Sequence, residues 1–217
     1  MSPSAREEIL GRIRQAVGAG DARERGAGYG SIDRNYEAAG TLEPEARSDL
    51  FVEHLKDYGA GVHRCREDAI AGTVAACLEA RNRRTIVVPP AVAESWLPAG
   101  FEYVRDEMLP YEQLDRSDGA ITGCTVAVAT TGSLILQHAG GLGRRALSLI
   151  PDYHLCVVYE HQVVETIPEA FQVLERDGVS SATIVSGPSA TSDIEMTRVQ
   201  GVHGPRTLDV ILVSTEG

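Results

Sequence analysis

A chain of 217 residues is long enough to bury one substantial core, and 43% hydrophobic and 24% charged residues are ordinary for a soluble globular protein. The formal net charge of −11 argues against a general nucleic-acid-binding protein, which would carry a basic surface. No apolar run approaches the roughly 18 residues that cross a bilayer, and the N-terminus lacks the apolar stretch of a secretory signal. We therefore expect a cytoplasmic protein with no membrane span.

The N-terminal part is predicted to be a helix followed by a flexible arm. Residues 5–17 place apolar side chains such as Ile9 and Ile13 at helical spacing, with charged side chains on the other face. Six glycines and mixed charges follow between residues 18 and 40, a composition typical of a linker. We predict two parts, the helix and arm over residues 1–45 and an α/β domain over residues 46–217.

Strands and helices alternate along the second part. The predicted helices are 45–58, 67–80, 91–97, 111–117 and 168–177, and the predicted strands are 61–65, 85–90, 101–106, 126–130, 133–137, 154–160, 182–185 and 207–213. Residues 121–125 are expected to form a short helix or turn. This order predicts a mixed, mainly parallel sheet flanked by helices. The TTG joint at 130–132 and the GGLG loop at 140–143 predict antiparallel hairpins within it.

The densest chemistry lies in residues 186–205, SGPSATSDIEMTRVQGVHGP. A helix is predicted over DIEMTRV, with Ser192 and Glu195 as its capping box. The amide groups of such a helix start bind anions, and ligands favour the carboxyl edge of an α/β sheet. Ser189 and Thr191 are therefore candidates for binding a carboxylate or phosphate at that edge.

His203 and Asp193 are the candidate acid–base pair, because an imidazole exchanges protons readily with a carboxylate partner. A triad of Ser189, Asp193 and His203 can be drawn, but triads are recognised by geometry rather than by sequence order. The alternative for His203, which lies between Gly201 and Gly204, is a turn residue that bonds to the backbone.

A second group of candidates follows the predicted hairpin. Arg144 and Arg145 supply planar guanidinium groups that suit a carboxylate or phosphate. His154, Thr131 and Ser133 are further candidates for anion binding. The alternatives are a solvated hairpin tip for the arginines, a satisfied core residue for His154, and a simple turn for the two hydroxyl residues. No segment has the spacing of a zinc site.

The four cysteines, at positions 65, 77, 124 and 156, show no C-x-x-C spacing. They lie in apolar or mixed segments, which is typical of buried free thiols. Because iron–sulfur clusters usually bind closely spaced thiolates, we expect none on this chain.

Three segments together resemble the LUD-domain family: ITGCTVAVATTGSLIL, RRALSLIPDYH, and SGPSATSDIE with the later GVHGP. The resemblance spans most of residues 50–213. It implies a fold like that of the sugar-phosphate isomerase and coenzyme A transferase superfamily. The family's TGT-type turn corresponds to Thr131, Gly132 and Ser133, and the preceding residue, often acidic in relatives, is Thr130 here. The family pattern is also matched at Arg144, His154, Ser189, Thr191, Asp193, Glu195 and His203.

The resemblance implies a role in oxidising L-lactate to pyruvate together with two partner lactate utilization proteins that carry iron–sulfur motifs. The expected ligand is a small 2-hydroxy acid or another anionic metabolite, and no cofactor is expected on this chain. In this hypothesis Arg144 holds the substrate carboxylate, and His203 with Asp193 accepts the hydroxyl proton across a cleft. Two alternatives stay open: a free-standing enzyme acting on a phosphorylated or coenzyme A-linked small molecule, and a non-catalytic assembly subunit.

Overall fold

The structure is a computed structural model. It describes residues 5–17, 31–33, 39–138, 142–192, 198–200 and 204–214, and only the backbone of residues 17, 190–192 and 198–200. Contacts between Cα atoms divide the chain into two units, residues 1–36 and 37–217. In the first unit, α1 (Ala5–Val17) forms the predicted amphipathic helix. The predicted domain boundary at residue 45 stays a prediction.

The second unit contains the remaining elements, which follow the predicted order closely. Its helices are α3 (Pro44–Asp57), α4 (Ile70–Ala80), α5 (Tyr111–Asp115) and α6 (Ile167–Arg176), and its short 3-10 turns are η1 (Glu67–Ala69), η2 (Glu94–Trp96), η3 (Ala129–Thr131), η4 (Arg145–Ser148) and η5 (Glu160–Gln162). Its strands are β1 (Gly61–Arg66), β2 (Thr85–Val88), β3 (Glu102–Arg105), β4 (Gly119–Gly123), β5 (Val126–Val128), β6 (Ser133–Gln137), β7 (Tyr153–Tyr159), β8 (Val163–Val164), β9 (Ala182–Val185), β10 (Ala190–Ser192), β11 (Arg198–Gln200) and β12 (Thr207–Ser214). None of the described helices is both long and apolar enough to span a bilayer.

Six strands form a parallel sheet in the order β1-β12-β7-β4-β2-β3. The central strand β7 is buried along almost its whole length, which explains its continuous apolar sequence YHLCVVY. Both faces of this sheet must therefore be covered. The predicted α/β class with a mainly parallel sheet flanked by helices is confirmed.

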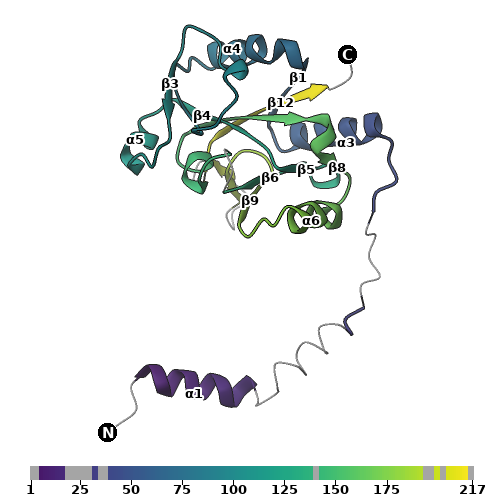
Figure 1. The fold of residues 1–217 in the computed structure, drawn as a ribbon, viewed down its shortest axis with the longest axis vertical. Coiled ribbons are helices and arrows are strands. Elements are labelled where there is room, and N and C mark those ends of the chain that lie inside the picture. Colours follow the sequence, from purple (N-terminus) through teal and green to yellow (C-terminus); the bar gives the residue numbers. More distant parts are fainter. Residues whose placement is uncertain are drawn as a thin grey trace. The chain divides into compact units, whose positions relative to one another are not determined.

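A second sheet, in the order β8-β5-β6-β9, covers part of one face of the parallel sheet. Strands β5 and β6 are antiparallel and joined through the TTG segment, so this predicted hairpin is confirmed. From one side to the other, the layers are α4, the parallel sheet, α3 with the small sheet, and α6 (Figure 1).

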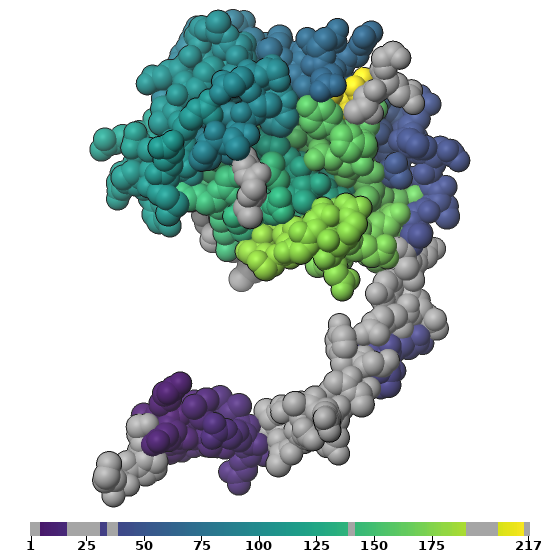
Figure 2. Space-filling model, viewed as in Figure 1, coloured from purple at the N-terminus to yellow at the C-terminus, as the bar shows by residue number. Residues whose placement is uncertain are grey.

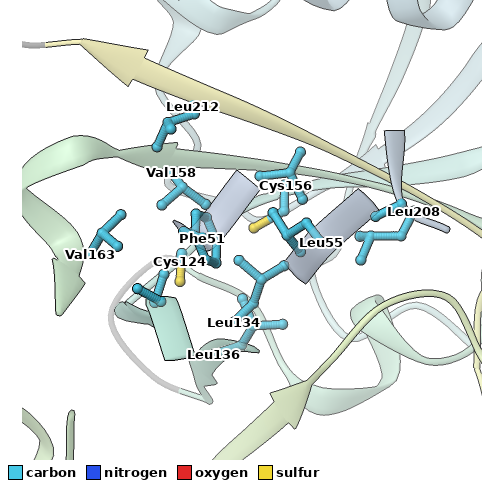
Figure 3. Close-up of a cluster of buried hydrophobic side chains, with 14 residues drawn as sticks. Phe51, Leu55, Cys124, Leu134, Leu136, Cys156, Val158, Val163, Leu208 and Leu212 are labelled. Atoms are coloured by element: carbon cyan, nitrogen blue, oxygen red, sulfur yellow. The ribbon is translucent and has the colours of Figure 1, made fainter. Parts of the chain in front are cut away.

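The core between the two sheets is centred on α3. Phe51 and Leu55 are fully buried there, among Leu134 of β6 and Leu208 of β12 (Figure 3). A side chain of this size contributes about 1.5–3 kcal/mol when fully buried. The small sheet and the parallel sheet are therefore held together largely through one helix.

Two predicted features of the central region are wrong. Residues 119–123 form β4 rather than a short helix or turn, because the small side chains of GAITG fit between β2 and β7 and are buried on both faces. The GGLG loop does not close a hairpin, since β6 pairs with β5 and β9 while β7 belongs to the other sheet. The loop is instead a connection between the two sheets.

Replacing Phe51 with alanine should lower the free energy of unfolding by about 3–5 kcal/mol, since the cavity would lie between the two sheets. Glu53→Ala, at an exposed position on the same helix, should change it by less than about 0.5 kcal/mol. Urea unfolding followed by circular dichroism measures both. Equal effects of the two substitutions would contradict a core centred on α3.

Candidate functional site

The TTGS segment is fixed against the C-terminal end of α3. Gly132 has a φ of +56°, and a Cβ atom there would lie 2.9 Å from the Cβ of His54 and 3.0 Å from its carbonyl carbon. Nδ1 of His54 is also 2.8 Å from the carbonyl oxygen of Ala129. Only glycine combines this backbone conformation with this close approach. The TTG turn is thus held by a helix from another part of the chain.

The SGPS segment is fixed against the same helix end in the same way. Gly187 has a φ of +87°, and a Cβ atom there would lie 3.3 Å from Cγ of Tyr58 and 3.4 Å from its carbonyl oxygen. Tyr58 is the C-cap residue of α3. Two glycines from segments more than fifty residues apart therefore pack on one turn of helix.

Strand pairing brings the hydroxyl groups of the two segments into contact. Leu134 lies opposite Val185 in the antiparallel β6–β9 pair, which places Ser133 opposite Ser186. The Oγ atoms of these serines are 2.7 Å apart, and Oγ1 of Thr131 is 2.8 Å from Oγ of Ser133. We call Thr131, Ser133 and Ser186 the hydroxyl corner. Ser133 is buried and Ser186 is exposed, so the chain of hydroxyls runs from the core to the surface.

Ser189 links the SGPS segment to the HGP segment and to the loop before β7. Its amide donates to the carbonyl oxygen of Pro205 at 2.8 Å. A Cβ atom on Gly204 would lie 3.5 Å from Cβ of Ser189 and 3.8 Å from Cδ2 of Leu149. The three segments that carry the family resemblance therefore meet in the described part of the chain.

The segment after Ser189 differs from the prediction. Strands β10 and β11 form an antiparallel hairpin in which Thr191 is opposite Val199 and Ser192 is opposite Arg198. The predicted helix over DIEMTRV is wrong at its C-terminal end, because Arg198 and Val199 are in β11. Ser192 ends β10, and the extended backbone of a strand end is also that of an N-cap residue, so its predicted capping box with Glu195 stays a prediction.

Asp193, Glu195 and His203 lie outside the described residues, so their predicted roles stay predictions. The expected position of the SGPS segment at the carboxyl edge of the parallel sheet is wrong. The preceding strand β9 belongs to the small sheet, and Pro205 contacts Ser189 just before the amino end of β12.

Arg144 lies at a different place, against the loop after β3. Its Nε and Nη2 donate to the carboxylate of Asp106 at 2.8 and 3.0 Å, and Nη2 also donates to the carbonyl oxygen of Leu109. The guanidinium lies over the Tyr111 ring, 5.5 Å from its centroid. Two of its three nitrogens are therefore engaged, and a ligand carboxylate would compete with Asp106 or use Nη1.

Arg145 lies near His138, at the end of β6. Burial and the positive charge of Arg145 lower the pKa of His138. Nε2 of His138 is 3.0 Å from Oγ1 of Thr183, on β9. The charge of Arg145 therefore acts on His138, next to the small sheet, whereas Arg144 binds the loop after β3.

His154 is fully buried near the amino end of β7. Its Nε2 is 2.8 Å from Oγ1 of Thr122, which also approaches Sγ of Cys156 at 4.0 Å. Burial lowers the pKa of His154 to about 4, so the imidazole is neutral at pH 7. A neutral, buried ring is a hydrogen-bonding group of the core rather than a cation for anion binding.

All four cysteines are free thiols, three of them buried. Burial raises the pKa of Cys65 and raises that of Cys77 to about 12. A hydrogen bond with Cys124 and burial raise the pKa of Cys156 well above its usual value. The thiols of Cys65, Cys77 and Cys156 are therefore protonated at neutral pH and are poor nucleophiles.

One group in the described part of the chain has side chains close enough to hold a cation: His63, Cys77 and Asp209, with ligand atoms within 4.8 Å of one another. Asp209 is buried and already accepts hydrogen bonds from Arg81 at 2.9 and 3.2 Å and from the Tyr153 hydroxyl at 2.9 Å. A cation would have to lie beside the Arg81 guanidinium and deprotonate Cys77. The group fits an internal ion pair better than a metal centre.

Sequence reasoning missed three residues that shape the site. Ser186 completes the hydroxyl corner, His54 supports the TTG turn, and Asp106 binds Arg144. Ser186 lies at the start of the SGPS motif, which was a usable signal. The partners of Asp106 and His54 lie 38 and 75 residues away in the sequence, and no local pattern marks them.

The model of the LUD domain matches residues 48–213. A relative from Deinococcus radiodurans, "Lactate utilization protein C", is 44% identical over 78% of this chain and 82% of its own length. "Lactate utilization protein C" of Bacillus velezensis is 26% identical over 96% and 95%. The crystal structure of a DUF162 family protein from Deinococcus radiodurans matches with a TM-score of 0.69 and 37% identity, over 80% of this chain and 99% of that one. The α/β fold and the three segments that meet at Ser189 are thus shared with a known class of α/β proteins. The chain belongs to the LUD domain family.

Gly132→Ala should destabilise the protein more than Gly178→Ala. Both glycines have positive φ, so each substitution costs roughly 1–2 kcal/mol of backbone strain. Gly178 has open space around it, whereas Gly132 faces His54, which adds about 1–3 kcal/mol of overpacking. Urea unfolding of both variants tests this, and equal losses would show that the TTG turn is not held against α3.

The stability of the protein should decrease as the pH is lowered, because His154 is buried in its neutral form. The unfolded histidine, with a pKa near 6.5, takes up a proton before the folded one, whose pKa is about 4. Stability due to the neutral ring is complete above pH 6.5 and falls by about 3 kcal/mol as the pH drops to 4. Unfolding free energies measured across this range should show a smaller slope in His154→Gln. A wild-type slope in His154→Gln would contradict the assignment.

Proposed function

We propose that this chain is a component of a lactate utilization system, required with two iron–sulfur partner proteins for oxidation of L-lactate to pyruvate. The observation that supports this most strongly is the 44% identity, over most of both chains, to a relative named "Lactate utilization protein C". The segments that meet at Ser133, Ser186 and Ser189 support a shared site as well as a shared fold.

The chemistry divides between this chain and its partners. Oxidation of the hydroxyl carbon of lactate releases two electrons and two protons. The cysteines of this chain are scattered, and the raised pKa values of Cys65, Cys77 and Cys156 favour protonated thiols over metal-binding thiolates. We therefore assign the electrons to iron–sulfur clusters on the partners. This chain would bind or position the substrate.

The hydroxyl corner is the proposed substrate-binding surface. Ser133 is held by Thr131 and Ser186, and the exposed end of the chain of hydroxyls, at Ser186, can donate to a carboxylate. Ser189 is tied to Pro205 beside Gly204, the residue that follows His203. We retain His203 and Asp193 as the proposed acceptors of the hydroxyl proton. Thr191 and Arg145 are retained as further anion-binding residues.

Arg144 has a more restricted role in this proposal. Its bidentate bond to Asp106, whose side chain is 1% exposed, satisfies a buried carboxylate. Removing one partner of such a pair typically costs about 3–5 kcal/mol. We propose that Arg144 supports the loop after β3 and offers only Nη1 to a ligand.

Lactate-dependent electron transfer should require this chain. In a system reconstituted with both iron–sulfur partners, omission of the chain should abolish reduction of the electron acceptor by L-lactate. Full activity without the chain would contradict the proposal. Turnover of a phosphorylated or coenzyme A-linked compound by the isolated chain would favour a free-standing enzyme instead.

Ser186→Ala should lower lactate-dependent reduction about tenfold or more, because a hydrogen bond to a charged group contributes about 1.5–3 kcal/mol. Ser180→Ala, an exposed serine before β9, is the matched control and should leave the rate unchanged. If the system containing Ser186→Ala and both partners reduces the electron acceptor as fast as the wild-type system, the hydroxyl corner does not bind the substrate. A non-catalytic assembly subunit would show that result.

A further inference from the structure

A groove of about 570 Å³ lies apart from the hydroxyl corner, between the start of α3, β1 and η5. Six of its seven lining residues are polar or charged, and the full lining is Pro44, Glu45, Arg47, Ser48, Arg64, Glu160 and His161. The size is within the range of small-molecule sites, roughly 300–1,000 Å³. Helix α3, in blue, and the green segment that contains η5 lie side by side in this part of the molecule (Figure 2).

Arg47 brings to the groove a guanidinium that forms no ion pair with any described residue. Its Nε is completely buried and has no hydrogen-bonding partner among the described residues, so a ligand in the groove would reach only Nη1 and Nη2. An oxyanion could accept from these two groups.

The remaining charges restrict which anion fits. Arg64 is the second guanidinium of the groove, and it is 2.5 Å from the carboxylate of Asp49. Glu45 and Glu160 add two more carboxylates to the lining. These carboxylates oppose a ligand of high negative charge. They favour a ligand that carries a single negative charge and also offers a hydrogen-bond donor.

From this arrangement we infer that the groove binds a small hydroxy-monocarboxylate, with its carboxylate on Arg47 and its hydroxyl donating to Glu160 or Glu45. The assignment rests on the proposed function only for the choice of a 2-hydroxy acid as the physiological ligand. The groove is a second ligand site on this chain, formed by residues other than those of the hydroxyl corner.

Binding of L-lactate, propionate and inorganic phosphate to the whole chain, measured by calorimetry or by ligand-observed NMR, tests the assignment. L-Lactate should bind more tightly than propionate, which lacks the hydroxyl, and phosphate should bind most weakly. In a Ser186→Ala background, where the hydroxyl corner has lost its donor, Arg47→Gln should weaken lactate binding about tenfold or more. Glu160→Gln should reduce the preference for lactate over propionate.

Arg66→Gln is the matched control, because this exposed arginine ends β1 and pairs only with Asp68 in the described structure. It should bind lactate like the wild type. Wild-type affinity in Arg47→Gln, no binding by the wild type at millimolar lactate, or tighter binding of phosphate would each overturn the inference. Thermal unfolding confirms that the variants are folded, and Glu160→Gln tests the groove independently if Arg47→Gln is unstable.

The reconstituted lactate-dependent reaction separates this inference from the proposed function. If the groove does not bind lactate but the reconstituted reaction still requires the chain, only the assignment of the groove is overturned. Lactate binding that depends on Arg47, in a system that does not need the chain, would overturn only the proposed function.

Discussion

The packing of α3 between two sheets is the constraint on which the rest of the second unit depends. Phe51 and Leu55 fill the space between the parallel sheet and the small sheet. The last turn of the same helix, at His54 and Tyr58, holds Gly132 and Gly187, the glycines adjacent to Ser133 and Ser186. One element therefore supplies both the core contact and the geometry of the site. Damage to its packing would move both serine-bearing segments together.

The helices and most strands could be predicted from the sequence because each has a local pattern. The apolar runs of β7 and β12 and the capped helix α6 are clear examples. Strand β4 was missed because GAITG has little apolar character, and it is a strand only because β2 and β7 flank it. Pairing with strands distant in the sequence determines the conformation of residues 119–123, and no local sequence pattern indicates that pairing.

The candidate site was predictable in its parts and not in its arrangement. The residues of TTGS and SGPS were recognised as chemical segments, yet their contact depends on the β6–β9 register. The predicted helix after Ser192 followed from a capping pattern, but its last two residues, Arg198 and Val199, pair with β10 instead. The charge of Arg144 was visible in the sequence, whereas its buried partner Asp106 became visible only in the fold.

The two glycines packed on α3 have an evolutionary consequence. Gly132 and Gly187 are hard to replace, because each needs positive φ and a close neighbour at once. Neither neighbouring serine has a positive φ, so the backbone at these positions accepts other L-residues. A lineage could therefore exchange hydroxyl side chains at positions 133 and 186, and with them the ligand, while the backbone that presents them stays fixed.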